Sequence, residues 1–485
     1  MPTRLTLAPT GLPIEDVVGA LRAALAAPSN AVLVAEPGAG KTTVVPLRLA
    51  DEAWLAGSRM VVLQPRRVVA RASARRMATM LGEEVGATVG YRTGEDRRVG
   101  STTRIEVVTE GIMTRRVQSD PELAGIGMVV FDEFHERHLD SDLGLALCLD
   151  VQRSLRPDLR LLVMSATIDA AGVAAVLAGP GTPAAPVITS RGRLHPVQIR
   201  WQPPAAATPV VDTVARVVRS ALVDHPIGDL LAFLPGVAEI TRVGHALSRE
   251  AGDAVEIRPL HGSLPASKQD RALAPARPGH RKVVLCTDLA ETSLTVEGVA
   301  LVVDAGLARS PRFDPATGLT RLHTGPASAA SADQRAGRAG RTGPGVAYRL
   351  WAQGEHRARR PWPDPEITTV DLTGLALELA VWGANPATLA WLDLPPPAAL
   401  ARAQALLADL GAVRPDRAVT AGDRSPRPGD PPSLPAVTPL GRRMVRLGAH
   451  PRLAAIVAAA PDADRWLACV LAALVDEPGT GSRLR

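Results

Sequence analysis

Short apolar runs alternate with amphipathic segments along the first part of the chain. Between about residues 14 and 195 the apolar runs lie at 31–36, 60–65, 105–109, 127–133 and 159–167. The segments between them, such as 68–81, repeat their apolar positions with the period of a helix. Buried strands separated by helices are typical of a parallel sheet with helices on both faces. The pattern therefore predicts an α/β domain over residues 1–195.

The same alternation begins again at about residue 196. Its apolar runs lie at 229–235, 255–262, 282–288, 300–306 and 345–351. We therefore expect a second α/β domain over residues 196–352. Beyond it the Pro-rich segment 415–438 is predicted to be a long loop. Amphipathic helices are predicted at 367–383, 398–413 and 440–448, and an apolar helix at 466–477.

The composition narrows the class of protein. A chain of 485 residues is long enough for three or four domains. No apolar run approaches the ~20 residues of a membrane span and the N-terminus lacks a secretory signal, so we expect a soluble protein of the cytoplasm. Cys148, Cys286 and Cys469 are too far apart in the sequence for a zinc motif or a disulfide framework. The net charge of +6 favours a polyanionic partner.

Lysine is scarce, since only Lys41, Lys268 and Lys282 are lysines among 55 basic residues. Arginine-rich segments are therefore weak evidence for nucleic acid, whereas a retained lysine suggests a role that a guanidinium cannot fill. Lys41 lies in residues 35–42, Ala-Glu-Pro-Gly-Ala-Gly-Lys-Thr, a phosphate-binding loop with Ala35 at the usual first glycine.

A strand precedes this loop and a helix follows it, as a phosphate site requires. Backbone N–H groups of such a loop point at an anion, the lysine reaches the β and γ phosphates, and the hydroxyl binds Mg²⁺. We therefore predict a site for ATP, or another nucleoside triphosphate, together with Mg²⁺. The predicted site residues are Gly38, Ala39, Gly40, Lys41, Thr42 and Thr43.

Asp132 and Glu133 end the fourth apolar run and precede Phe134 and His135. The carboxyl end of a strand beside the phosphate loop is where a further magnesium contact is expected, and an adjacent glutamate can orient the attacking water. We predict that Thr42, Asp132 and Glu133 form the Mg²⁺ site and that Glu133 activates water. For the tetrapeptide alone, an exposed turn after a core strand is the alternative.

Further segments follow in the order of helicase motifs. They are motif Ia at 64–67, motif Ib at 109–111, motif II at 132–135, motif III at 165–167, motif IV at 233–236, motif V at 286–295 and motif VI at 334–341. On these residues the chain resembles the DEAH/RHA helicases of superfamily 2. Phe134, where the family usually has Ala, favours the bacterial HrpB-type ATP-dependent helicases within it.

The resemblance implies an α/β fold with two tandem RecA-like P-loop domains. A winged-helix domain is expected over 353–437, and the start of a helical-bundle (ratchet) domain over 438–485. Relatives continue into an OB-like domain, so the resemblance implies a truncated bundle. Basal ATPase activity is then expected to survive, while RNA binding is expected to be weak and salt-sensitive, with little unwinding.

Motif VI implies groups that complete the nucleotide site from the second domain. By resemblance, Gln334 contacts the γ-phosphate or the attacking water, and Arg338 and Arg341 are arginine fingers that stabilise developing charge. Their spacing places both arginines on one helical face. A solvated basic helix is the alternative.

Motif V implies that Ser293, Thr295 and Glu297 line the nucleotide side. The base is expected to stack on Arg76. The family's aromatic partner for the base is replaced in this chain, and Leu307 is its expected position. Broad use of nucleoside triphosphates is therefore expected.

The resemblance also implies contacts to the phosphates of one RNA strand, from Arg66, Arg67, Thr109, Gly111 and Thr287. Asp288 stands where the family usually has Asn, and a carboxylate only accepts hydrogen bonds, so a donor role there is in doubt. Segment 310–321 predicts a hairpin. In relatives this hairpin wedges the duplex apart, and an ordinary connecting hairpin is the alternative.

These observations predict an enzyme that hydrolyses ATP, moves 3′ to 5′ along single-stranded RNA and unwinds duplex. A DNA-directed translocase and a nucleotide-gated RNA-binding scaffold are the alternatives. The expected partner is single-stranded or structured RNA, or DNA, with no membrane, and a monomer is expected. The sequence does not identify a protein partner.

Overall fold

The computed structural model describes residues 5–476 apart from 27–29, 37, 56, 95, 167–168, 193–194, 206–207, 250–253, 292–293, 295, 315–317 and 415–434. The chain divides into two compact units. The first unit comprises Met1–Ser310 and Leu322–Asp364, and the second comprises Pro311–Arg321 and Pro365–Arg485. The boundaries of the four predicted domains stay a prediction.

The first unit contains two sheets, each the centre of a lobe. The first lobe has an eight-stranded sheet in the order β4-β3-β5-β2-β6-β7-β1-β8, which is parallel except for β4. Its strands are β1 (Ala31–Ala35), β2 (Arg59–Gln64), β3 (Val89–Arg92), β4 (Arg97–Arg98), β5 (Ile105–Thr109), β6 (Ile126–Phe131), β7 (Arg160–Ser165) and β8 (Val187–Ser190). The five predicted strands are confirmed, while β3, β4 and β8 were not predicted.

Helices cover both faces of this sheet, and β6 and β7 are therefore buried along their whole length. Helices α1 (Glu15–Ala26), α2 (Lys41–Leu49) and α3 (Arg67–Leu81) share one core cluster with β1 and β2. On the other face Gly144 of α5 (Leu139–Ser154) lies against Phe131 and Leu63. The remaining helices are α4 (Glu110–Ser119) and α6 (Ala170–Ala178).

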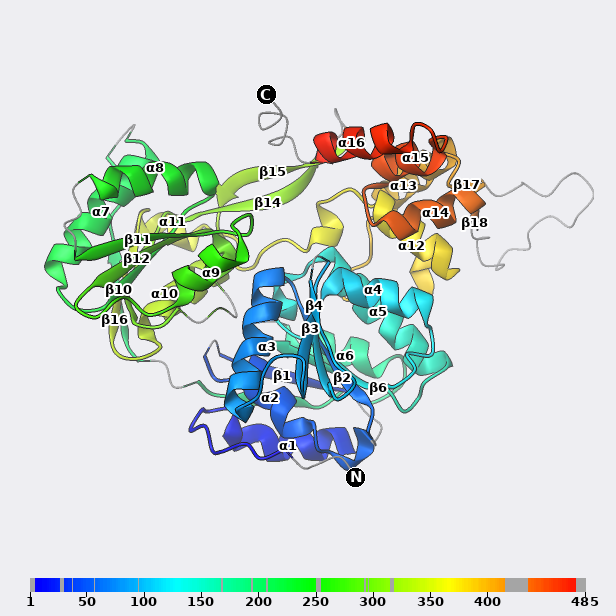
Figure 1. Cartoon of the computed structure of the whole chain (residues 1–485), viewed down its shortest axis with the longest axis horizontal. Coiled ribbons are helices and arrows are strands. Elements are labelled where there is room, and N and C mark those ends of the chain that lie inside the picture. Colours follow the sequence, from blue (N-terminus) through cyan, green and yellow to red (C-terminus); the bar gives the residue numbers. More distant parts are fainter. Residues whose placement is uncertain are drawn as a thin grey trace, which may run out of the picture. The chain divides into compact units, whose positions relative to one another are not determined.

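The second lobe has a six-stranded sheet, all parallel, in the order β11-β12-β10-β13-β16-β9. Its strands are β9 (Val197–Trp201), β10 (Asp229–Phe233), β11 (Val255–Leu260), β12 (Arg281–Cys286), β13 (Val299–Asp304) and β16 (Gly345–Arg349). Its helices, green to yellow in Figure 1, are α7 (Val210–Asp224), α8 (Val237–Ser248), α9 (Ala266–Leu273), α10 (Ala329–Gly337) and α11 (Gln353–Arg357). The five predicted strands are again confirmed, and β9 was missed.

The predicted hairpin is formed by β14 (Leu307–Asp314) and β15 (Leu319–Pro326). Its tip belongs to the second unit, where the backbone N–H of Phe313 donates to the carbonyl of Thr369. The wedge and the ordinary connection both remain open for this element.

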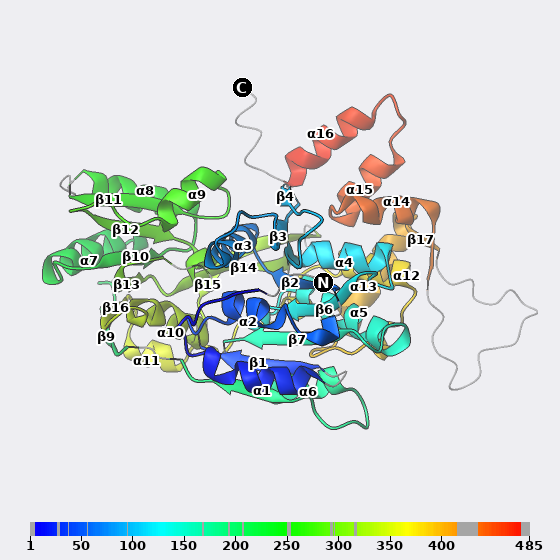
Figure 2. The same ribbon diagram turned by 60° about the horizontal axis from the view of Figure 1, so that its bottom comes forward.

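The second unit is mostly helical. It contains α12 (Thr373–Trp382), α13 (Pro397–Asp409), α14 (Pro439–Leu447), α15 (Pro451–Ala459), α16 (Arg465–Asp476) and a short antiparallel pair, β17 (Val413–Arg414) with β18 (Ala436–Val437). In Figure 2, α14, α15 and α16 follow one another in orange to red. The predicted long loop at 415–438 lies outside the described residues from 415 to 434.

Candidate nucleotide site

The P-loop joins β1 to α2, as predicted. Gly38 and Gly40 have positive φ of 90° and 98°, a conformation that favours glycine. A Cβ at Gly40 would lie only 2.9 Å from the side chain of Leu12. Ala35 ends β1 in a buried position, so alanine is compatible with the strand there. Helix α2 then begins at Lys41, which directs its free N–H groups toward the loop.

Five side chains behind the loop are joined by an ion pair and hydrogen bonds. The Nζ of Lys41 lies 2.8 Å from Oε1 of Glu133, and both residues are 5 % exposed or less. The Thr42 hydroxyl donates to Oδ2 of Asp132 at 2.6 Å. The amide of Gln64 donates to the same oxygen at 2.7 Å. Gln64 ends β2 at the carboxyl edge of the sheet, and sequence reasoning gave it no part in this site.

Asp132 and Glu133 lie where β6 ends. Glu133 has a positive φ of 54°, which is uncommon for a residue with a side chain and is found most often at functional sites. Burial and the neighbouring charge of Glu133 raise the pKa of Asp132 to about 6, against the opposing effects of Lys41, Thr42 and Gln64. The charge of the Asp132 carboxylate is therefore not fully compensated by the groups around it.

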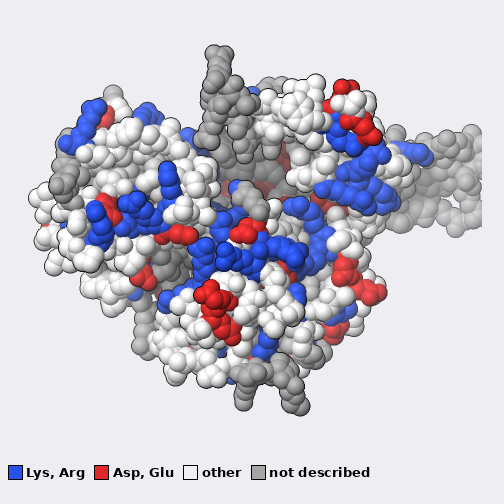
Figure 3. Space-filling model, viewed as in Figure 1, with Lys and Arg blue, Asp and Glu red and all other residues white. Residues whose placement is uncertain are grey.

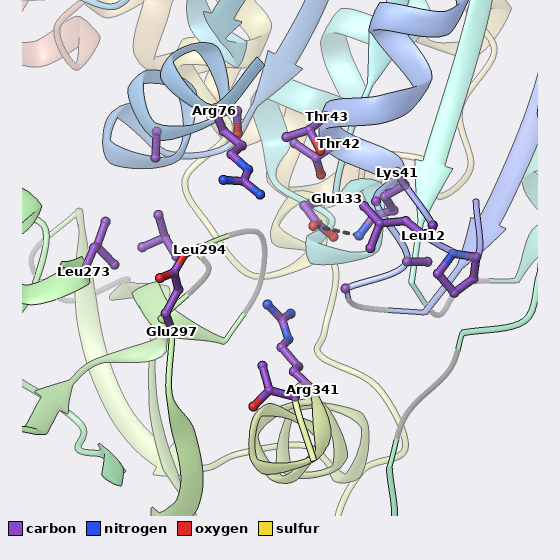
Figure 4. Close-up of a pocket in the computed structure, with 18 residues that line it drawn as sticks. Leu12, Lys41, Thr42, Thr43, Arg76, Glu133, Leu273, Leu294, Glu297 and Arg341 are labelled. Atoms are coloured by element: carbon purple, nitrogen blue, oxygen red, sulfur yellow. Dashed lines mark hydrogen bonds and ion pairs between the residues drawn. The ribbon is translucent and has the colours of Figure 1, made fainter. Parts of the chain in front are cut away.

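A cavity of about 510 Å³ opens in front of these residues, a volume within the usual range of small-molecule sites. Figure 4 shows Lys41, Thr42 and Glu133 on one side and Arg341 pointing toward Glu133 from the other. The predicted residues that line it are Gly38, Ala39, Gly40, Lys41, Thr42, Thr43, Arg76, Glu133, Glu297 and Arg341. Both lobes therefore contribute to one cavity.

The three predicted residues of motif VI differ in position. Arg341 lines the cavity, and burial lowers its pKa to about 10 while the charge of Glu133 opposes that shift. Arg338 instead donates to the backbone carbonyls of Glu291, at 3.0 Å, and of Leu294. Gln334 is buried in α10, and neither it nor Arg338 lines the cavity. Of the two expected arginine fingers, the structure brings one to the site.

Arg76 of α3, which is predicted to stack on the base, lines the cavity together with Leu273 at the end of α9 and Leu294. That Leu307 stands at the position of the family's aromatic stays a prediction. Leu307 lies at the start of β14, its carbonyl accepts from Arg335, and it does not line this cavity. Leu273 is an aliphatic residue of the wall that it shares with Arg76 and Leu294. Only its place on α9 reveals this, because no sequence spacing connects it with Arg76.

The predicted phosphate-contacting residues lie outside the cavity. Arg67 is exposed at the first turn of α3, Thr109 caps α4 and Gly111 lies in its first turn. The Thr287 hydroxyl accepts from the N–H of Leu289. Arg66 is held by two carboxylates, those of Glu136 and Asp288. The predicted nucleotide contacts Ser293 and Thr295 lie outside the described residues.

Two protein-family models match the chain. The DEAD/DEAH box helicase model matches residues 19–176, and the helicase conserved C-terminal domain model matches residues 213–343. The chain is 45 % identical over 471 residues, 97 % of its length, to the ATP-dependent RNA helicase HrpB of Escherichia coli K12. The chain belongs to the DEAD/DEAH box helicases. The resemblance of the sequence to the DEAH/RHA group is thereby confirmed.

Other helicases and a solved structure agree with this assignment. The chain is 36 % identical to the human probable ATP-dependent RNA helicase DHX34 over 80 % of its length. A crystal structure of the E. coli DEAH/RHA helicase HrpB superposes with a TM-score of 0.86 at 44 % identity, covering 96 % of this chain. The two sheets are therefore the two RecA-like domains of the family. The chain spans 55 % of HrpB and 34 % of DHX34.

Two negative findings concern the described residues alone. No helix among them is long and apolar enough to cross a membrane. No group of three or more His, Cys, Asp and Glu side chains among them could hold a metal ion. A Mg²⁺ ion is commonly bound by one or two protein groups, water and substrate phosphates, so the second finding is compatible with the predicted magnesium site.

Proposed function

We propose that this chain is the motor part of an ATP-dependent RNA helicase that hydrolyses ATP to move 3′ to 5′ along single-stranded RNA and unwind duplex. The observation that carries the proposal is the cavity that places Glu133 of the first lobe opposite Arg341 of the second. A water-orienting carboxylate and an arginine on the transferred phosphoryl group are the two groups that phosphoryl transfer to water needs. HrpB, a relative over nearly the whole chain, is an RNA helicase by name.

Each residue of the site has a role in this proposal. The loop amides and Lys41 hold the phosphates, Glu133 orients the water, and Arg341 stabilises charge on the γ-phosphoryl group. The hydroxyl of Thr42 and the carboxylate of Asp132 are hard oxygen donors 2.6 Å apart and suit Mg²⁺. When bound, Mg²⁺ supplies charge neutralisation at the β and γ phosphates. In this scheme Gln334 and Arg338 also reach the site. For Arg338 this requires that its guanidinium leaves the backbone carbonyls that it now contacts.

The nucleic acid is proposed to lie along exposed basic residues of the first lobe. Figure 3 shows Lys and Arg side chains gathered across the region where Figure 1 labels α3, β3, β4 and α4. Exposed arginines there are Arg67, Arg75, Arg97, Arg98 and Arg115. Such side chains hold phosphates without reading sequence. Thr109 and Thr287 supply hydroxyls to the same strand in this proposal.

The test is ATP turnover with and without matched RNA and DNA oligomers, followed by strand displacement on duplexes with a 3′ or a 5′ overhang. We expect RNA to stimulate turnover, and we expect displacement from the 3′ overhang only. Stimulation by DNA alone would make the protein a DNA translocase. Absence of turnover with intact nucleotide binding would make it a nucleotide-gated scaffold. A cytoplasmic, monomeric protein is part of the proposal, and size-exclusion chromatography with light scattering tests the monomer.

A further inference from the structure

Helix α3 lies between the nucleotide cavity and the second lobe. Its residues Ala72, Ser73 and Arg76 line the cavity. Its residues Val68 and Val69 belong to a core cluster that otherwise consists of second-lobe side chains, among them Phe233, Leu289 and Leu294. Helix α3 therefore lines the nucleotide cavity with some of its residues and packs against the second lobe with others.

Arg66 directly precedes this helix and joins turns of both lobes. Its Nη2 lies 2.9 Å from Oε2 of Glu136, in the turn after β6 of the first lobe. The same Nη2 lies 3.0 Å from Oδ2 of Asp288, and Nη1 donates to the carbonyl of Asp288 at 3.1 Å. Asp288 begins the turn after β12 of the second lobe. One guanidinium thus connects the motif II turn with the motif V turn.

Two other polar contacts join α3 to the second lobe. Arg71 donates to the side chain of Gln269 at 2.8 Å, and Arg75 pairs with Asp270 at 2.7 Å. Arg75 and Asp270 are 46 % and 45 % exposed, and exposed ion pairs contribute little. In the Arg66–Asp288 pair the carboxylate is also 46 % exposed, but the arginine side chain is only 21 % exposed, so this pair is shielded from solvent on the arginine side.

The charge at position 288 is what makes this contact an ion pair. An asparagine, usual at this position in the family, could accept from Arg66 but could not neutralise it. Burial raises the pKa of Asp288, but the charges of Arg66 and Arg335 and the Thr287 hydroxyl outweigh it, so the pKa lies below its ordinary value. Asp288 is therefore ionised at neutral pH.

We propose that Arg66 and Asp288 form a latch that holds the two lobes closed over the nucleotide cavity and so positions Arg341 opposite Glu133. The two residues are positioning residues, because neither lines the cavity. The contact between the lobes follows from the structure alone, whereas its effect on ATP turnover rests on the proposed function.

The direct test measures the distance between the lobes. Donor and acceptor dyes on Ser119→Cys of α4 and Ser248→Cys of α8, both exposed positions, report closure by energy transfer in the full chain. Exposed Cys469 is replaced by Ser, while Cys148 and Cys286 are buried. Without nucleotide, Asp288→Asn should lower the closed fraction about two- to five-fold relative to the parent. Raising the salt from about 50 to 500 mM should do the same to the parent, because screening weakens a half-exposed pair.

Asp158→Asn is the matched control. It removes the same charge and breaks an arginine pair, with Arg156, but that pair lies within the first lobe and Asp158 is 64 % exposed. The control should leave the energy transfer unchanged. Equal energy transfer in Asp288→Asn and the parent would overturn the latch.

Basal ATP turnover without RNA gives a second readout. Asp288→Asn and Arg66→Gln should each lower kcat/KM about two- to five-fold, and the double variant should be no worse than Arg66→Gln alone. Independent, multiplying effects would contradict the latch. If the parent hydrolyses no ATP, the proposed function fails, and the energy-transfer measurement still decides on the latch.

Discussion

Lys41 and Glu133 form a buried ion pair. Removal of the lysine and neutralisation of the glutamate should therefore have different effects on binding, turnover and stability. Glu133→Gln should keep ATP binding and reduce turnover by at least about 100-fold, the range of general-base catalysis. Lys41→Ala should lose nucleotide binding and about 3–5 kcal/mol of stability, because it leaves a buried carboxylate without its lysine. Fluorescent-nucleotide titration, phosphate release and urea unfolding measure the three quantities. Near wild-type turnover of a folded Glu133→Gln variant would refute the role of Glu133.

Ionisation of Asp132 lowers the stability of the folded protein. Its pKa of about 6 exceeds the ordinary 3.8, so the folded protein binds this proton more tightly than the unfolded chain does. The contribution of Asp132 to the free energy of unfolding therefore decreases as the pH rises from about 4 to about 6. Without divalent cations, Asp132→Asn should be more stable than the parent at pH 7 by about 1–3 kcal/mol and equal to it below about pH 4. Urea unfolding of Asp132→Asn and of the parent at both pH values tests this prediction. A variant less stable than the parent at pH 7 would contradict it.

Leu273 lines the same cavity as Arg76, the residue predicted to stack on the base. Leu273→Phe should lower the Kd for ATP about three- to ten-fold, because an aromatic ring adds stacking on the base. Leu307→Phe is the matched control, since Leu307 does not line the cavity, and it should leave the Kd unchanged. Equal Kd values for the two variants would show that Leu273 does not contact the base.

At the scale of the element, the motif VI turn Arg338–Gly340 depends on one glycine more than on the other. A Cβ at Gly340 would lie 2.6 Å from the carbonyl of His195, while a Cβ at Gly337 would meet nothing within 4 Å. Gly340→Ala should displace the turn that presents Arg341, lowering the free energy of unfolding by about 1–3 kcal/mol and basal turnover with it.

Gly337→Ala supplies the comparison for this prediction. Gly337 ends α10 with ordinary helical φ, so alanine should keep or slightly raise stability there. Thermal unfolding and phosphate release on both variants test the pair. Equal behaviour of the two would contradict the close approach to His195.

At the scale of the whole molecule, the excess of arginine predicts salt-sensitive RNA binding. Each phosphate contact contributes about −0.7 to the slope of log K against log salt on a single strand. Arg97→Gln with Arg98→Gln, on exposed β4, should therefore reduce the slope by about 1 to 1.5. Arg242→Gln with Arg249→Gln, exposed in the middle of α8 and directly after it, should not change the slope. Fluorescence anisotropy across a salt series measures both, and equal slopes for the two double variants would exclude β4 from the RNA path.

Several features of this protein followed from the sequence alone. Short apolar runs between segments of helical period predicted ten strands of the two sheets, most of them central, because a strand buried on both faces must be apolar along its length. The P-loop and the Asp132-Glu133 pair were predicted because their chemistry depends on residues that are adjacent in the chain. The edge strands β4 and β9 were missed because their half-exposed residues lack such a pattern.

Only the tertiary structure decided which distant residues meet. Leu273 lines the same cavity as Arg76, Gln64 holds Asp132, and Arg66 pairs with Asp288. These contacts join residues far apart along the chain, and no local periodicity records them. Arg338 and Arg341 share a sequence motif and a helical spacing, yet one contacts backbone carbonyls and the other faces the cavity. The direction of a long, flexible side chain depends on the partners that the fold brings within its reach.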